Sequence, residues 1–331
     1  MQIEPIIPKE VLEEIFKKAG FDSIPNREEA TEMLNGLKSD CPSYLFRYSS
    51  YSRVKQILEE KRIFIQTPAK MNDLFDFQPI LDYNITKTDA LKTIEILYKR
   101  DFFINVSNKL KIEDFISKET DKNIIQQAFT QVFGDLFIEI FEQQRFSTKI
   151  LCFSEKCDNQ LLWAHYGDNF SGICLQLNFT SMDTASKLSV HKVKYVDQTP
   201  ILNIFDYFIN PYKYLTSLIK SMTVKNTDWT YEQEWRLILA DQFQTFKDIN
   251  FIPLRPDFIS KIIFGVRTPF EQIIELMKLV EKDNSINFFK CFLDERRNRK
   301  IFFGHINKIE TIKTNDLKII EFYSGFENNI S

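Results

Sequence analysis

Glycine is scarce in this 331-residue chain: only eight are present, and none forms the glycine-rich phosphate loop of Rossmann or P-loop proteins. Those two nucleotide-binding folds are therefore excluded. Long hydrophobic runs are also missing, since Ile262 to Val266 falls far short of the roughly 18 residues that a membrane helix needs. An excess of positive charge is missing too. The 43 basic and 46 acidic side chains give a net charge of −3, so no overall positive field attracts nucleic acid or an anionic membrane.

Cysteine is present in an odd number, five, in a chain long enough to bury a sizeable core without disulfides. The segment from Met1 to Glu13 lacks the basic and then apolar pattern of a secretory leader. Both observations predict a reducing compartment, and we expect the protein in the cytoplasm.

The hydrophobic pattern predicts an α+β protein with an N-terminal helical appendage at 1–40 and a main domain at 41–331. Residues 44–49 are β-like, 54–61 helical and 62–66 β-like again. Helical periodicity between 86 and 144 predicts a helical insertion at about 86–147. Further strands are expected at 150–154, 172–179, 190–196, 234–239, 262–265, 288–293, 300–303 and 317–323, with helices at 160–166, 212–225 and 269–282. The central sheet is expected to be mixed or antiparallel.

The segment Thr230 to Leu237 has the most informative charge pattern. If it is extended, alternation puts Tyr231 and Trp235 on one face and Glu232, Glu234 and Arg236 on the other. A solvated strand face would explain these charges without a function. A polar cleft would explain them as well.

The short helix expected at 160–166 concentrates large amphipathic side chains, Trp163, His165 and Tyr166. Asp158 or Asn159 can cap its N-terminus, and Gly167 can end it in a left-handed conformation. The helix follows a strand that carries Ser154 and Glu155. A structural histidine is the alternative to a functional His165.

Two further segments carry candidate binding groups. Arg47 lies beside Tyr48 in an otherwise apolar strand, where a buried charge needs a carboxylate partner or an anionic ligand such as phosphate. The loop after Pro68 contains Asn72, Asp73 and Asp76. These side chains can bind a divalent cation or hydrogen-bond their own backbone.

Together the motifs resemble the bacterial family of domain of unknown function 2971 (DUF2971). They occur in that family's order between about 44 and 266: Leu-Phe-Arg-Tyr at 45–48, Met-Asn-Asp-Leu-Phe-Asp at 71–76, Cys-Phe-Ser-Glu at 152–155, Leu-Trp-Ala-His-Tyr-Gly at 162–167 and Tyr-Glu-Gln-Glu-Trp-Arg at 231–236. The family name supplies no reaction.

The order of an arginine, a serine and a Glu-x-Glu also resembles the plan of ADP-ribosyltransferases. That resemblance implies NAD as co-substrate, with Arg47 on its phosphates or ribose, Ser154 ordering the nicotinamide-ribose pocket and Glu234 on the ribose 2′-hydroxyl. Glu232 would be an acceptor-side carboxylate. A fixed carboxylate suits this chemistry, because breaking the nicotinamide–ribose bond develops oxocarbenium charge.

The resemblance to ADP-ribosyltransferases also implies the remaining site residues. His165 joins Glu232 and Glu234 as a catalytic candidate, and Tyr48, Trp163 or Tyr166 could cover the nicotinamide. The acceptor, a protein or a nucleic acid, is not defined by the residues, and no structural metal is expected. A toxin or phage-defence role would fit such an enzyme.

Two other classes of function stay open. A metal-dependent nuclease or phosphodiesterase would gather its ligands from Asp73, Asp76, Glu155, Glu232 and His165 around a divalent cation. Zinc is disfavoured, because Cys152 and Cys157 have no second cysteine or histidine pair nearby. A non-enzymatic binding or sensor module would use the same side chains for recognition. The basic run at 295–300 can be the solvated turn of a hairpin, or it can contact the phosphates of a nucleic acid.

Overall fold

The computed structural model describes residues 41–73, 75–99, 106–180, 190–239, 250–283, 285–293 and 300–306. The predicted N-terminal appendage at 1–40, the basic run apart from Lys300, and the predicted strand at 317–323 lie outside these ranges. Within them, no helix is both long enough and apolar enough to cross a membrane.

An eight-stranded sheet forms the centre of the molecule, in the order β14-β13-β12-β5-β1-β4-β10-β6. The strands are β1 (Tyr44–Ser49), β4 (Lys149–Ser154), β5 (Ile173–Asn178), β6 (Val190–Lys192), β10 (Glu234–Leu239), β12 (Ile259–Phe264), β13 (Asn287–Leu293) and β14 (Ile301–Ile306). Strands β12 and β13 pair in parallel, whereas the other neighbours in the sheet pair antiparallel. The predicted α+β class with a mixed sheet is therefore confirmed.

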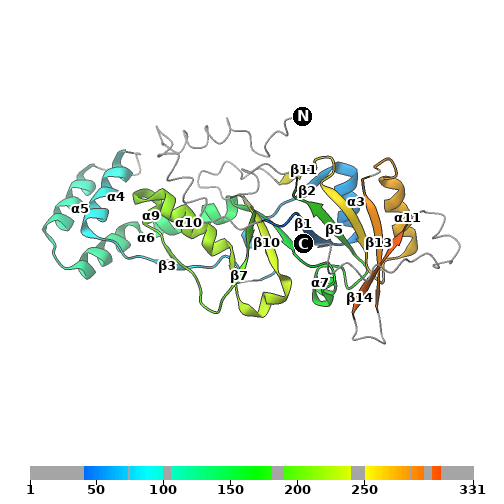
Figure 1. Cartoon of the computed structure of the whole chain (residues 1–331). Coiled ribbons are helices and arrows are strands. Elements are labelled where there is room, and N and C mark those ends of the chain that lie inside the picture. The colour runs from blue at the N-terminus through cyan, green and yellow to red at the C-terminus, as the bar shows by residue number, and fades with distance from the viewer. Residues whose placement is uncertain are drawn as a thin grey trace.

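Two helices cover one face of this sheet. Helix α3 (Tyr51–Glu60) buries Val54, Ile57 and Leu58, whose spacing of three and four residues forms a single apolar stripe. Helix α11 (Phe270–Leu279) packs into the same hydrophobic cluster as α3 and the inward-facing residues of β1, β5 and β12. Figure 1 shows both helices at the sheet end of the molecule.

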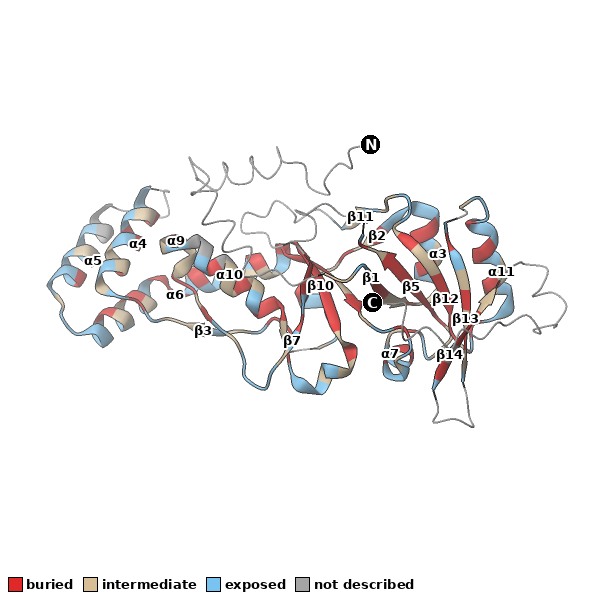
Figure 2. Cartoon of the chain, in the orientation of Figure 1, coloured by how far each residue is buried: buried red, intermediate tan, exposed pale blue. Residues whose placement is uncertain are grey.

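A separate helical region occupies the other end of the molecule (Figure 1). It contains α4 (Lys87–Lys99), α5 (Val106–Lys118), α6 (Lys122–Ser147), α9 (Asp206–Ile209) and α10 (Pro211–Met222). The first three occupy the range of the expected insertion. Their core is rich in phenylalanine, and Phe205 contacts both Phe129 and Phe137 edge to face. Figure 2 shows the buried residues concentrated along the sheet and along the inner sides of these helices.

Shorter elements complete the described part of the fold. They are β2 (Arg62–Phe64), η1 (Pro68–Lys70), β3 (Ile80–Asp82), α7 (Gln160–His165), β7 (Lys194–Tyr195), β8 (Ile201–Asn203), β9 (Val224–Lys225), η2 (Thr227–Glu232) and β11 (Phe251–Pro253). The expected strand at 190–196 is split at Val193, whose N–H donates to the carbonyl of Glu234. Strands β13 and β14 pair antiparallel, as the expected hairpin requires.

Candidate active site

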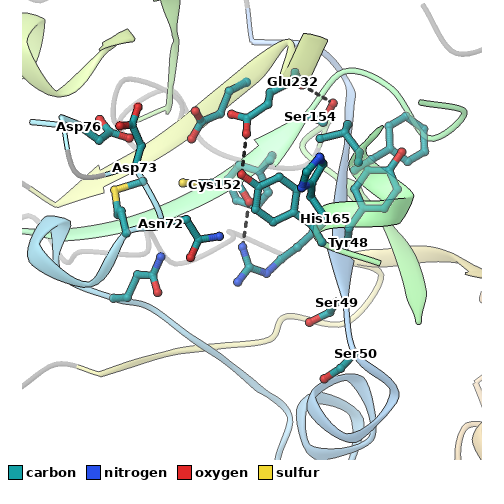
Figure 3. A pocket seen from close by; sticks show the side chains of 18 of the residues that line it. Tyr48, Ser49, Ser50, Asn72, Asp73, Asp76, Cys152, Ser154, His165 and Glu232 are labelled. Carbon is teal, nitrogen blue, oxygen red and sulfur yellow. Dashed lines mark hydrogen bonds between the residues drawn. The ribbon is translucent and has the colours of Figure 1, made fainter. Parts of the chain in front are cut away.

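A cavity of about 390 Å³ lies against β1, β4 and β10 and is also lined by the loop after η1 and by α7. Seven of the eight predicted site residues line it: Arg47, Tyr48, Ser154, His165, Tyr166, Glu232 and Glu234. Trp163 does not line it. The polar loop residues Asn72, Asp73 and Asp76 also face the cavity, and Figure 3 shows them opposite Ser49 and Ser50.

Strand order explains how residues so far apart in the sequence meet. Ser154 of β4 is the register partner of Phe46 in β1 and also of Glu234 in β10. The neighbour of Phe46 is Arg47, so the three predicted segments cross the sheet side by side. Strands β1 and β4 share only this one register pair, and the cavity is lined by residues that flank it on both strands.

Arg236 holds the acidic side of the cavity together. Its Nη1 and Nη2 donate to the two carboxylate oxygens of Asp76 at 2.8 and 2.6 Å. Its Nε and Nη2 donate to the two oxygens of Glu234 at 2.8 and 2.9 Å, and Nη1 also donates to the carbonyl of Met222 at 2.6 Å. All five guanidinium N–H groups therefore have acceptors, and none remains for a ligand.

The charged face of β10 is buried. Relative exposure is 4% for Glu232, 5% for Glu234 and 0% for Arg236. The interpretation of these charges as a solvated strand face is therefore wrong, because Asp76 and Lys225 pack against them and replace water. The opposite face of β10 does alternate as expected, with Trp235 in the hydrophobic core.

Glu232 lines the cavity from a 3-10 helix and not from an extended strand. It ends the 3-10 helix η2, and Gln233 has a left-handed φ of 43° that turns the chain into β10. The extended conformation considered for residues 230–237 is therefore wrong before Glu234, whereas the strand predicted at 234–239 is confirmed. The turn directs the carboxylate of Glu232 towards Tyr166, which donates to Oε1 at 2.6 Å, and towards Lys225, whose Nζ lies 2.7 Å from Oε2.

The environments of Glu232 and Glu234 move their pKa values in opposite directions. Burial raises the pKa of Glu232, and the nearby negative charge of Glu234 raises it further, while Lys225 and Tyr166 oppose the shift. Burial would also raise the pKa of Glu234, but Arg236 and Lys225 outweigh it and lower that pKa to about 2. Glu234 is thus ionised at any physiological pH, whereas Glu232 is the carboxylate better suited to exchange a proton.

Ser154 positions Glu232. Its hydroxyl donates to the backbone carbonyl of Glu232 at 2.6 Å and accepts from the N–H of Lys156 at 3.1 Å. The side chain is only 5% exposed. Its position in the cavity wall matches the sequence prediction, but its hydrogen bonds are made within the protein.

Helix α7 supplies the aromatic wall. Of the two predicted cap residues, Asn159 caps it by accepting from the N–H groups of Leu161 and Leu162. Trp163 is fully buried, donates its indole N–H to the carbonyl of Cys157 and contacts Tyr48 edge to face at 5.1 Å. It therefore supports Tyr48, which lines the cavity. His165 lines the cavity with an exposed side chain.

The end of α7 differs from the expected glycine cap. The left-handed conformations fall on Asp168, Asn169 and Phe170, with φ of 49°, 50° and 69°. Gly167 is required for another reason, since a Cβ there would lie 2.7 Å from Cε3 of Trp163. Its role is close packing against the buried indole.

The residues of the metal-dependent alternative are not grouped as ligands. Glu155 lies outside the cavity, where it accepts from the indole N–H of Trp235 and from Lys192. Asp73 accepts from the backbone N–H of Phe75, the local hydrogen bond that such turns favour. In the described ranges no three His, Cys, Asp or Glu side chains are arranged to hold an ion.

Two basic residues of the cavity wall, Arg53 and Lys225, were not predicted from the sequence. Arg53 follows β1 in the first turn of α3, so its position next to the Arg47 strand was a usable signal. Lys225 lies seven residues before Glu232 with a 3-10 helix between them. Its contact with Glu232 carries no sequence signature.

Comparison with known proteins adds one match. The model of the family described as "Protein of unknown function (DUF2971)" matches residues 162–237. The comparison with curated proteins and the comparison with solved structures gave no match. The matched segment contains the Leu-Trp-Ala-His-Tyr-Gly and Tyr-Glu-Gln-Glu-Trp-Arg motifs and ends at Leu237 in β10. Over this segment, which supplies α7 and the Glu232–Glu234 pair of the cavity, the chain shows the predicted resemblance to DUF2971.

Proposed function

We propose that this chain is an ADP-ribosyltransferase-like enzyme that cleaves the nicotinamide–ribose bond of NAD in the cavity described above. The observation that carries the proposal is that Arg47, Glu232 and Glu234 all line one cavity. NAD has an anionic diphosphate and a cationic nicotinamide ring. A cavity with arginine at one side and carboxylates at the other complements both charges.

The buried charge cluster supports a role for Glu234 in stabilising positive charge. Asp76, Glu232 and Glu234 face two cations, Arg236 and Lys225, which leaves one excess negative charge when Glu232 is ionised. As the C–N bond breaks, its electron pair leaves with nicotinamide and the ribose gains oxocarbenium character. A carboxylate held rigidly by Arg236 stabilises that charge without having to reorganise.

Glu232 is suited to act as the general base. Its raised pKa lies closer to neutrality than that of Glu234, and a base works best when its pKa approaches the operating pH. In the proposed step Glu232 accepts the proton of the acceptor nucleophile while that nucleophile bonds to the ribose C1 atom. Tyr166 and Lys225 hold the carboxylate in place.

A second cavity offers space for an acceptor. It has a volume of about 620 Å³ and shares Asn72, Asp73 and Lys225 with the first. Trp229 lies in its wall, and Phe75, 84% exposed, also faces it. Because Lys225 bonds Glu232 directly, this second cavity adjoins the proposed base.

The test is release of nicotinamide from NAD by the purified protein. We expect Glu234→Gln and Glu232→Gln each to lower the rate at least about a hundredfold, the size of effect seen when one group that stabilises a transition state is removed. Glu155→Gln is the matched control, because Glu155 adjoins the site strand but lies outside the cavity. Arg47→Ala should raise KM for NAD.

A parallel assay with chelator separates this proposal from metal-dependent hydrolysis. Nicotinamide release should persist with chelator present. Absence of release, together with absence of a thermal shift at saturating NAD, would contradict the proposal and favour a hydrolase or a binding module.

A further inference from the structure

One end of the cavity carries two arginines that have no acidic partner. Arg47 comes from β1 and Arg53 from the first turn of α3, and both line the cavity. In the part of the chain that the structure describes, neither forms an ion pair with a carboxylate, whereas Arg236 in the same region is fully paired. Two unpaired guanidinium groups facing one space favour an anionic ligand.

Arg47 is partly buried and has a hydrogen-bond donor to spare. Its Nη1 donates to the carbonyl of Cys152 at 2.8 Å, the lower dashed line in Figure 3, but its Nε is buried and has no hydrogen-bond partner. Burial lowers the pKa of Arg47 to about 10; Cys152 opposes this shift, and the positive charge of Arg53 adds a smaller lowering. A bound anion would accept a hydrogen bond from this Nε. It would also offset both the burial of the Arg47 charge and its repulsion by Arg53.

The start of α3 adds backbone donors to the same end. Ser50 is the N-cap residue, but its side chain makes no capping hydrogen bond, and the first turn of α3 contains no acidic residue. Ser49 and Ser50 both line the cavity. The uncapped N–H groups and the positive end of the helix dipole therefore add to the field of the two arginines.

We infer that Arg47, Arg53 and the N-terminus of α3 form a subsite for the phosphate groups of a nucleotide. This deepens the proposed function, on which it rests for the identity of the nucleotide as NAD. Asp73 lies on the opposite side of the cavity (Figure 3) and would repel phosphate. The ligand is thereby oriented with its phosphates at α3 and its ribose towards Glu234.

Equilibrium binding of ADP, pyrophosphate and inorganic phosphate to the full-length protein tests the subsite. We expect ADP and pyrophosphate to bind, and Arg53→Gln to weaken both by about tenfold or more, the effect of losing one charge-assisted hydrogen bond of at least ~1.4 kcal/mol. Arg47→Gln should act in the same direction. Because Arg53 is exposed, its substitution leaves folding intact.

Arg62→Gln is the matched control. Arg62 follows the other end of α3, pairs with Glu60 and does not line the cavity. Arg62→Gln removes the same charge as Arg53→Gln. If the effect of Arg53 on ADP binding is local, the affinity of Arg62→Gln for ADP should stay within about twofold of the wild type. Adenosine, which has no phosphate, should bind wild type and Arg53→Gln equally.

The outcomes separate this subsite from the proposed reaction. If ADP binds and Arg53→Gln weakens it, the subsite stands even if the wild type releases no nicotinamide. If ADP and pyrophosphate do not bind, or if they bind wild type, Arg53→Gln and Arg62→Gln equally, the subsite is overturned, even if nicotinamide is released. Binding of inorganic phosphate alone, without any gain for ADP, would also overturn the nucleotide assignment.

Discussion

The hydroxyl of Tyr166 donates a 2.6 Å hydrogen bond to Oε1 of Glu232. The other carboxylate oxygen, Oε2, lies 2.7 Å from Nζ of Lys225. One group is neutral and the other cationic, and each favours the ionised form of a carboxylate whose burial favours the neutral form. The pKa of Glu232 therefore depends on burial, which raises it, and on Tyr166 and Lys225, which lower it. Single substitutions should change this pKa in a predictable direction.

Tyr166→Phe should raise the pKa of Glu232, because it removes a hydrogen bond that stabilises the carboxylate. If Glu232 is the general base, the acid limb of the pH profile for nicotinamide release should move to higher pH. Carbon-13 NMR titration of the glutamate carboxyls measures the same shift without any substrate. Tyr48→Phe is the control, since its hydroxyl bonds the carbonyl of Lys156 and no carboxylate. An unchanged Glu232 titration in Tyr166→Phe would contradict this account.

Arg236→Met should destabilise the protein by about 3–5 kcal/mol, because it leaves Asp76 and Glu234 buried without their shared cation. Urea unfolding at neutral pH measures the loss. Adding Asp76→Asn to Arg236→Met should recover part of it. Lys118→Met removes one side of an exposed pair with Asp114 and should cost less than about 1 kcal/mol. Equal losses of unfolding free energy in Arg236→Met and Lys118→Met would contradict the prediction that the buried ion pairs matter more than an exposed one.

Acid should weaken the fold through Glu234. Its folded pKa of about 2 lies below the ordinary 4.5, so the unfolded chain takes up the proton first as pH falls. Stability is therefore present above about pH 4.5 and is lost between there and about pH 2, by roughly 3 kcal/mol for this group. Glu232, with its raised pKa, acts in the opposite direction and stabilises the fold most at low pH.

Urea unfolding at several pH values between 6 and 2.5 measures this dependence. Glu234→Gln should flatten the loss below pH 4.5, whereas the exposed Glu281→Gln should leave it unchanged. The assignment fails if the slope persists in Glu234→Gln.

Gly172→Ala should destabilise the protein by about 1–3 kcal/mol through overpacking, because a Cβ there would lie 2.4 Å from the carbonyl oxygen of Ser49. Ser49 precedes the N-cap of α3, so the same change should weaken ADP binding. Gly134→Ala is the control: its nearest contact would be 3.4 Å, in the middle of α6. There the helix propensity of alanine should stabilise by up to about 1 kcal/mol. Thermal unfolding and ADP titration of both variants check this contrast.

Many elements of the fold were predictable from short windows of sequence. The strand at Tyr44–Ser49, the strand at Glu234–Leu239 and the Asn159 cap were all read correctly, because alternation and capping depend on neighbouring residues. The turn at Gln233 was missed, since a left-handed φ in a non-glycine residue has little local signature. That single turn changed the path of Glu232.

The chemical types of the site residues were determined by the sequence itself, whereas their partnerships were decided only by the tertiary structure. Nothing near Arg236 in the sequence indicates that it pairs with Asp76, 160 residues away, or that Arg47 lacks a carboxylate partner. Strand order brings β1, β4 and β10 together, and burial then replaces water with protein groups. In that low-dielectric setting, the charges facing each side chain determine whether it supports the fold or remains free to bind a ligand.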